Sequence, residues 1–294
     1  MYYRRKILLS LMDAFGGKVG KIDLQKLLFL FTQLQTKPNF YFVPYKFGAF
    51  SFQANADLNT MLKYDLVSDS DKLWIKISKT NFIKELKNSD RVLLSKIRDK
   101  FGSYSTANLI KYTYLNYPYY AINSTIVQNY LSAKKIIKIA ESRPTNLNTS
   151  LYTIGYEGIS LEQYVNKLIH YDIKVLFDVR NFPRSMKYGF SKKQLKHAVE
   201  NVGIKYFHLP RLGIVSSKRR SLNTQKDYNK LFKEYSESVL KTNIADQQEI
   251  LGSLIKEKRV ALTCFEANIK QCHRFHLANS VVDLSKRKYK VAHI

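Results

Sequence analysis

Cysteine and long apolar runs are both scarce in this 294-residue sequence. Cys264 and Cys272 are its only cysteines, whereas a secreted disulfide framework needs more. The apolar run over residues 7–12 is interrupted by Asp13, which does not fit a signal peptide, and no run approaches the roughly 20 residues that span a bilayer. These absences argue against disulfide-rich secreted proteins and membrane proteins. We expect a soluble cytoplasmic protein without a membrane partner.

Motifs that bind common nucleotide cofactors are also missing. The sequence contains no phosphate-binding P-loop, no G-x-G-x-x-G dinucleotide fingerprint and no internal repeat. We therefore predict no cofactor. The length of 294 residues leaves room for two domains, each with a core of its own.

Acidic residues are few, because 23 Asp and Glu stand against 49 Lys and Arg, which gives a net charge of +26. The excess is uniform: residues 1–148 carry 23 basic and 10 acidic side chains, and residues 149–294 carry 26 and 13, so each half is +13. Such a field attracts polyanions, and we predict DNA, single- or double-stranded, as the partner. The alternative is a Lys-, Asn- and Tyr-rich composition inherited from an AT-rich genome. RNA and the oligomeric state stay open.

Helical periodicity dominates the N-terminal region, and its apolar spacing predicts a succession of short elements. They are a helix over residues 4–15, a helix over 24–34, a strand over 40–50, a helix over 52–64 and a hairpin formed by 66–67 and 73–77. This is the order of a winged-helix domain, so we predict a winged-helix-like nucleic-acid-binding domain over residues 1–80. A helical connector over 81–140 and a polar linker over 141–150 follow.

The third helix of a winged-helix domain commonly enters the major groove of DNA. In this sequence that helix presents a row of polar side chains, namely Gln53, Asn55, Asn59 and Lys63. We predict that these residues contact nucleic acid. The same residues equally fit a solvated helix face.

The pattern changes after residue 150, where short apolar runs alternate with helical stretches. The predicted strands cover 151–155, 175–179 and 260–264, and the predicted helices cover 161–171, 191–202, 228–256 and 273–284. This alternation is typical of an α/β fold. We therefore predict a C-terminal three-layer α/β/α domain with a mainly parallel sheet over 151–294, preceded by the mostly helical winged-helix-like domain.

Polar side chains follow the predicted strands, at the sheet edge where such folds bind ligands. Asp178 and Glu266 are candidates for acid–base chemistry, and Cys264 and His273 are candidates to assist. The candidate substrate- or anion-binding residues are Arg180, Arg274, Tyr156, Ser185 and His208. Plainer interpretations also fit, since Asp178 can cap a turn and Cys264 can be an inert core residue.

Two further clusters have alternative interpretations. Cys264, Cys272, His273 and His276 suggest zinc, but zinc sites usually show Cys-x2–4-Cys or His-x3–5-His pairs, and seven residues separate the two cysteines; the spacing therefore predicts no metal. The loop over 216–224 contains three consecutive basic residues, Lys218, Arg219 and Arg220. It is either a phosphate clamp on nucleic acid or a solvated turn.

Four motifs in the C-terminal half carry a resemblance to a known family. They are "TIGYEG", "DVRNFPRS", "YFHLPRLG" and "LTCFEANIKQCHR", and together they resemble the domain of unknown function 488 family. The resemblance implies an α/β fold and a polar site built from these motifs. It departs at Tyr156 and Glu157, where the family more often has His-Ser, and at Ile214, where it has Gly.

The N-terminal motifs "DLQKLLFL" and "FVPYKFGAFS" resemble those of the Panacea antitoxin-like proteins. Ala49 replaces the proline of that family. This resemblance is shorter than the C-terminal one.

Taken together, a basic reader-like module and a site rich in acids, bases and arginines favour an enzyme that acts on DNA. Its chemistry is directed at a base or a phosphodiester, as in a hydrolase or a glycosylase, in DNA processing or defence. The alternative is a non-catalytic regulator whose α/β domain senses a small anion. A third hypothesis is a nucleotide- or sulfur-handling enzyme.

Overall fold

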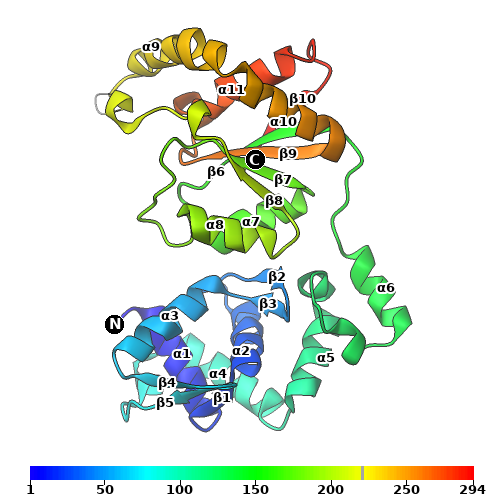
Figure 1. The fold of residues 1–294 in the computed structure, drawn as a ribbon. Helices are drawn as coiled ribbons and strands as arrows, with labels where there is room; N and C mark the ends of the chain where they lie inside the picture. Colours follow the sequence, from blue (N-terminus) through cyan, green and yellow to red (C-terminus); the bar gives the residue numbers. More distant parts are fainter. Residues whose placement is uncertain (220–221) are drawn as a thin grey trace. The chain divides into compact units, whose positions relative to one another are not determined.

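The computed structural model describes residues 1–219 and 222–294. The chain divides into two compact units, Met1–Arg143 and Pro144–Ile294 (Figure 1). No helix in the described residues is long and apolar enough to cross a bilayer.

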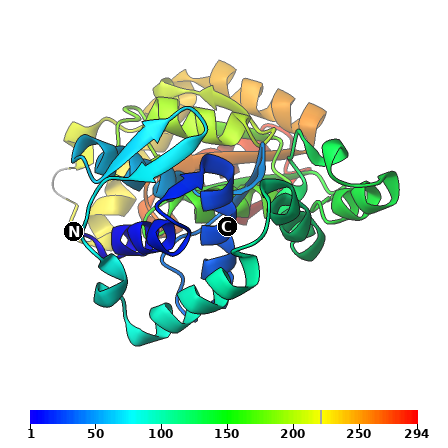
Figure 2. The same cartoon turned by 90° about the horizontal axis from the view of Figure 1, so that it is seen from below.

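The N-terminal unit begins with the elements that the sequence predicts, together with some that it does not. In chain order they are α1 (Tyr3–Ala14), β1 (Lys18–Gly20), α2 (Lys21–Leu34), β2 (Val43–Tyr45), β3 (Gly48–Phe50), α3 (Phe52–Lys63), β4 (Val67–Ser70) and β5 (Leu73–Lys76). β1, β5 and β4 form a three-stranded antiparallel sheet, and the hairpin of β4 and β5 is cyan in Figure 2. The single strand predicted over residues 40–50 is wrong, because this segment folds back as the antiparallel hairpin β2–β3.

Glycine makes that hairpin possible. Gly48 follows the turn with a φ of +90°, a conformation that other residues rarely adopt. A Cβ atom at this position would also lie 2.6 Å from Lys26 Nζ and from the ring of Tyr114. Ser51 then caps α3 by accepting a hydrogen bond of 3.2 Å from Ala54 N.

The remainder of the N-terminal unit is helical. It comprises a 3-10 turn at Phe82–Glu85, α4 (Asn88–Phe101), α5 (Thr106–Asn116), 3-10 turns at Pro118–Ala121 and Val127–Asn129, and α6 (Ala133–Glu141). Apolar residues of α1, α2 and α3 form the main core with α4 and β5. A smaller core lies around Ile110, Tyr114 and Ile139.

The C-terminal unit is a five-stranded sheet with helices on both faces. Its elements are β6 (Ser150–Gly155), α7 (Leu161–His170), β7 (Val175–Asp178), α8 (Lys192–Glu200), β8 (Lys205–His208), α9 (Gln225–Tyr235), α10 (Ile244–Glu257), β9 (Arg259–Cys264), α11 (Arg274–Asp283) and β10 (Lys290–His293). The strand order is β10-β6-β9-β7-β8, and all four pairings are parallel. The predicted α/β fold with a mainly parallel sheet is therefore confirmed.

One predicted helix of this unit is wrong in extent. The helix expected over residues 228–256 is interrupted, because α9 continues into a π-helical turn at Ser236–Leu240 and α10 begins only at Ile244. Asn243 lies at the break and donates a side-chain hydrogen bond of 2.8 Å to Val239 O. That bond competes with the regular helical pattern.

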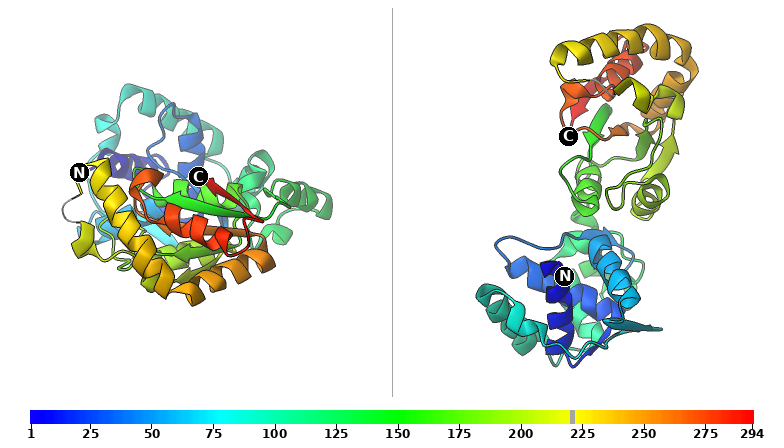
Figure 3. Two further views of the ribbon diagram at one scale, coloured as in Figure 1. Left: turned by 90° about the horizontal axis from the view of Figure 1, so that it is seen from above. Right: turned by 90° about the vertical axis from the view of Figure 1, so that its left-hand side faces the viewer.

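The path of the chain leaves a crevice at one edge of the sheet. α7 and α8 cover one face, and α9, α10 and α11 cover the other (Figures 1 and 3). β6 and β9 are neighbours, yet the chain leaves β6 toward α7 and leaves β9 toward α11. Loops that diverge in this way at the carboxyl ends of parallel strands form a ligand-binding crevice.

Candidate functional site

A pocket of about 410 Å³ lies at the carboxyl edge of the C-terminal sheet. The sheet-edge pocket, as we call it, is lined by residues from four segments of the chain: Tyr156; Arg180, Asn181, Phe182, Arg184, Ser185 and Met186; Ile214, Ser216 and Arg219; and Cys264, Phe265, Glu266 and His273. The strands β6, β7 and β9 thus deliver their following residues to one place. Its volume is within the range of small-molecule sites.

Asp178 is the last residue of β7. It does not line the pocket. Its side chain is 0% exposed, and its carboxylate accepts hydrogen bonds from Arg180 Nε at 2.8 Å, Arg180 Nη2 at 2.5 Å and Tyr206 Oη at 2.6 Å. A carboxylate so fully occupied has little capacity left to accept a proton from a substrate. The geometry therefore makes Asp178 a positioning residue, and its predicted catalytic role remains untested.

Arg180 is the second residue after the end of β7, where the chain turns and the guanidinium folds back over Asp178. Its Nη1 donates to Tyr156 Oη at 2.7 Å and to Phe190 O at 2.8 Å. Burial disfavours the charge, but the hydrogen bond and charge of Asp178 outweigh it and raise the pKa of Arg180. Tyr156 in turn stacks on Phe190 with ring centroids 4.2 Å apart. These contacts fix the guanidinium at the pocket wall.

Four predicted or suspected site residues meet at the other wall. Glu266 pairs with Arg219, and its Oε2 lies 3.1 Å from Cys264 Sγ. Arg219 Nη2 lies 2.9 Å from His273 Nδ1. His273 Nε2 lies 3.0 Å from Val179 O, and because a carbonyl only accepts, Nε2 carries the proton and Nδ1 faces the cluster with a lone pair.

Cys272 is also part of this cluster, but it lies beneath the surface of the pocket and does not line it. Its Sγ lies 3.9 Å from His273 Nδ1, and Cys264 Sγ lies 3.8 Å from the same nitrogen. Both cysteines are buried and free. The hydrogen bond with Cys272 and the charge of Arg219 lower the pKa of Cys264, while burial raises the pKa of Cys272.

Arg274 supports the site without entering it. The side chain is buried, and Nη1 donates to Glu266 O at 2.5 Å. Glu157 holds the same loop by accepting a hydrogen bond of 2.9 Å from Ala267 N. Gly155 lets the loop approach, because a Cβ atom there would lie 2.0 Å from Glu266 O. The geometry thus gives Arg274 a structural role, and its predicted anion contact remains untested.

Two other candidates differ in their placement. Ser185 lines the pocket, where its Oγ accepts a hydrogen bond of 3.1 Å from Lys187 N. His208, at the end of β8, lies outside the lining, with Nε2 2.9 Å from Arg180 O. His208 thus supports the backbone of Arg180, and its predicted contact with a substrate or anion stays a prediction.

The three consecutive basic residues of the loop over 216–224 differ in their placement. Arg219 turns into the sheet-edge pocket, while Lys218 is exposed and pairs with Glu234. Arg220 lies outside the described residues. Arg184 and the apolar residues Phe182, Met186 and Phe265 also line the pocket but were not predicted as site residues, although Phe182 and Arg184 belong to the "DVRNFPRS" motif. Membership of this motif was the signal that could have identified Phe182 and Arg184.

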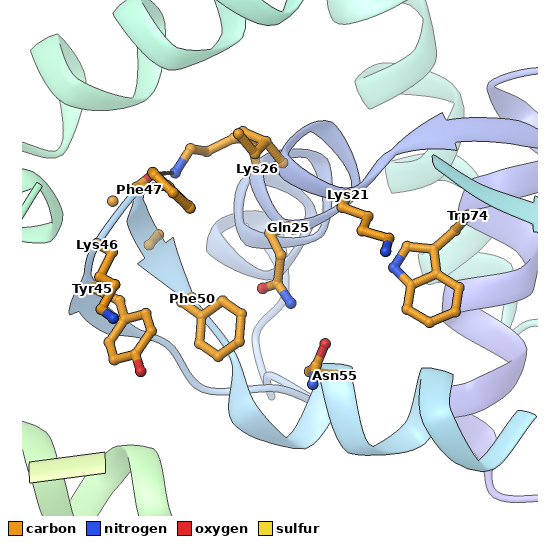
Figure 4. Close-up of a pocket in the computed structure, with 12 residues that line it drawn as sticks. Lys21, Gln25, Lys26, Tyr45, Lys46, Phe47, Phe50, Asn55 and Trp74 are labelled. Carbon is orange, nitrogen blue, oxygen red and sulfur yellow. Dashed lines mark hydrogen bonds between the residues drawn. The ribbon is translucent and has the colours of Figure 1, made fainter. Parts of the chain in front are cut away.

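The other predicted nucleic-acid-binding residues, those of the N-terminal unit, lie on α3. Asn59 and Lys63 are exposed, and Gln53 and Asn55 are partly exposed. Asn55 also lines a second, smaller pocket of about 260 Å³, which we call the N-terminal pocket. Figure 4 shows Asn55 and Gln25 there between the rings of Phe50 and Trp74.

Comparison with known proteins gives one family. Residues 160–281 match the model described as "Domain of unknown function DUF488". The match lies within the C-terminal unit and supports the predicted resemblance of that unit. No curated protein and no solved structure matches the chain. The resemblance of the N-terminal region to the Panacea proteins remains a prediction.

Proposed function

We propose that this protein binds nucleic acid and that the sheet-edge pocket performs hydrolytic chemistry on it, at a base or a phosphodiester. One observation carries the proposal: the pocket gathers Glu266, His273 and Cys264 with three arginines in a chain of net charge +26. A site of this composition offers proton transfer beside anion recognition.

The arginines supply the anion contacts. Arg184 is exposed at the pocket, where its guanidinium carbon lies 5.0 Å from the ring centroid of Phe182. Arg219 is partly exposed and pairs with Glu266. Arg180 is committed to Asp178. Arg184 is therefore the first contact for a phosphate, and Arg219 reaches one by exchanging its carboxylate partner for it.

Exposed apolar side chains supply a surface for a base. Phe182 is 60% exposed and Met186 105% exposed, and Phe265 is exposed as well. Large apolar side chains in water at a pocket favour stacking on an unpaired base. A base in duplex DNA must be flipped to reach such a site, so single-stranded DNA is the better substrate.

Glu266 is the general base in this proposal. It lines the pocket, and its carboxylate is held by Arg219 and lies next to Cys264. It activates water, while Arg184 and Arg219 neutralise negative charge that develops on the substrate. Asp178 acts indirectly by fixing Arg180.

The N-terminal unit delivers the substrate. Its elements α1, β1, α2, α3, β4 and β5 follow the order of a winged helix, with the hairpin β2–β3 inserted. The buried face of α3 packs on the core, so Asn59 and Lys63 point outward and are available to DNA. The uniform charge of +13 in each unit makes both units contribute to affinity.

The experiment is incubation of the full-length protein with labelled single- and double-stranded oligonucleotides. Released bases and altered nucleosides are measured by mass spectrometry, and strand cleavage is measured on denaturing gels. E266Q should abolish product but leave binding, measured by fluorescence anisotropy, nearly unchanged. R184Q should weaken both, while the matched control R287Q, which removes the same charge from an exposed Arg287–Asp283 pair, should change neither by more than about twofold.

The outcomes separate the hypotheses. Bound but unaltered DNA supports the regulator that senses a small anion and contradicts the enzymatic proposal. The absence of both binding and product contradicts the nucleic-acid proposal altogether.

A further inference from the structure

We infer that Cys264, Cys272 and His273 form a binding site for a transition metal ion, with Zn²⁺ as the best fit. Their three potential ligand atoms, two sulfurs and one imidazole nitrogen, all lie within 4.8 Å of one another. All three side chains are buried. Soft thiolate and imidazole ligands in this combination select zinc over magnesium or calcium.

The distances are close to those of a formed zinc site. With Zn–S bonds of about 2.3 Å and Zn–N bonds of about 2.05 Å, tetrahedral angles separate a sulfur and a nitrogen ligand by about 3.5 Å. Cys264 Sγ and Cys272 Sγ lie 3.8 and 3.9 Å from His273 Nδ1. Contraction by about 0.3 Å, within side-chain adjustment, converts the cluster into ligand geometry.

The orientation of His273 is also that of a ligand. Its Nε2–H donates to Val179 O at 3.0 Å, and the remaining lone pair, on Nδ1, is directed to the sulfurs. Histidines that bind metals generally donate their other ring N–H to a carbonyl or carboxylate, which fixes the tautomer. This contact comes from the segment after β7, so the sheet itself orients the ligand.

The fourth position faces the sheet-edge pocket. Cys264 and His273 line that pocket, whereas Cys272 closes the site from behind. Three protein ligands with an open side are typical of catalytic rather than structural zinc. Glu266, with Oε2 3.1 Å from Cys264 Sγ, lies where a base for a zinc-bound water belongs. Two cysteines, one histidine and a non-ligating glutamate are also the set that activates water in zinc-dependent nucleobase deaminases.

Arg219 competes with the metal. Its Nη2 lies 2.9 Å from His273 Nδ1, so it uses the lone pair that zinc needs. Metal binding therefore requires Arg219 to leave the imidazole, after which it is available to an anionic substrate. The contact of Arg219 with a substrate and the use of a zinc-bound water as reactant both rest on the proposed function, whereas the metal site itself does not.

The test is metal content of the reduced full-length protein after reconstitution with Zn²⁺ and removal of excess, measured by mass spectrometry. We expect close to one zinc per chain. Cobalt substitution should give the intense visible bands of a tetrahedral site and a thiolate-to-cobalt charge-transfer band. C272S and H273Q should keep less than about a tenth of the metal, while the matched control H276Q, three residues further along the same helix, should keep all of it.

R219M keeps all three proposed metal ligands and removes only the side chain that competes for His273 Nδ1, so it tests the site even if C272S or H273Q fails to fold. It should bind zinc at least as tightly as the wild-type chain. Absence of bound metal in both the wild-type chain and R219M, with both thiols still reacting with alkylating reagent in the presence of Zn²⁺, would overturn the inference. Equal zinc in C272S and wild type would do the same. Bound zinc without any nucleic-acid product leaves the metal site standing and contradicts the proposed function alone.

Discussion

Replacement of Asp178 by asparagine tests whether this residue positions Arg180 or takes part in chemistry. The substitution removes the charge but retains the size of the side chain and an oxygen that can accept from Tyr206. It leaves the guanidinium of Arg180, only 6% exposed, without its counterion. Breaking a buried ion pair from one side costs about 3–5 kcal/mol.

The expected size of the effect follows from the contacts. Two of the four hydrogen bonds of the Arg180 guanidinium go to Asp178, and the other two go to Tyr156 Oη and Phe190 O. D178N therefore removes the counterion charge but leaves two of the four contacts that position the guanidinium. For a unit of about 150 residues, such a loss lowers the melting temperature by roughly 6–20 °C. R180M should be similarly severe, because it leaves a buried carboxylate. The double variant D178N/R180M should be less destabilised than the sum of the two, with a coupling of about 2 kcal/mol.

The assay is urea unfolding followed by circular dichroism and by tryptophan fluorescence. Trp74 is the only tryptophan of the chain and belongs to β5 of the N-terminal unit, so its fluorescence transition is an internal control that should not move. A change in stability below about 1 kcal/mol for D178N would refute the counterion role. Loss of turnover without loss of stability would return Asp178 to the list of catalytic candidates.

Three further predictions concern both units. Burial lowers the pKa of Lys26 to about 7, so between about pH 7 and 10.5 the folded protein binds fewer protons than the unfolded protein. From pH 7 to 9 the free energy of unfolding of the wild type should therefore rise by about 2 kcal/mol relative to that of K26M. The measurement is urea unfolding followed by Trp74 fluorescence. An equal pH dependence in both proteins would contradict this. G155A should destabilise by more than about 2 kcal/mol, because the new methyl group meets Glu266 O, whereas G252A, in open space on α10, should stabilise by up to about 1 kcal/mol. DNA affinity should fall linearly with salt on logarithmic axes, with a slope of several counterions; a salt-independent anisotropy titration would rule this out.

The sequence predicted the central strands well and the edge strands poorly, for a physical reason. β7 and β9 are buried over their whole length, so they appear as continuous apolar runs. β8 and β10 lie at the two edges of the sheet; β8 alternates exposed residues with a buried and a partly buried one, and β10 has no buried residue. Four residues with that pattern are not distinguishable from a loop by composition.

For the candidate site, the sequence predicted where the residues lie better than what they do. Strand ends predicted the location of Arg180, Cys264 and Glu266, because parallel strands share a carboxyl edge. The full occupation of the Asp178 carboxylate was not predictable, since one of its partners, Tyr206, is 28 residues away in the sequence. Zinc spacing rules describe ligands on one short turn, whereas here the turn at Ile269–Gln271 brings Cys272 back to Cys264.

The basic character of the chain overstates the charge available to a ligand in the pocket. Arg180 is neutralised by Asp178, and Arg274 is committed to backbone carbonyls of the Glu266 loop. Arg219 is paired with Glu266. In the function that we propose, net charge attracts nucleic acid, whereas recognition in the pocket depends on Arg184 and on an exchange at Arg219. Arg219 contacts both Glu266, the proposed base, and His273 Nδ1, the proposed metal ligand. Its departure would free these two groups together, which couples substrate binding to the chemistry that we propose.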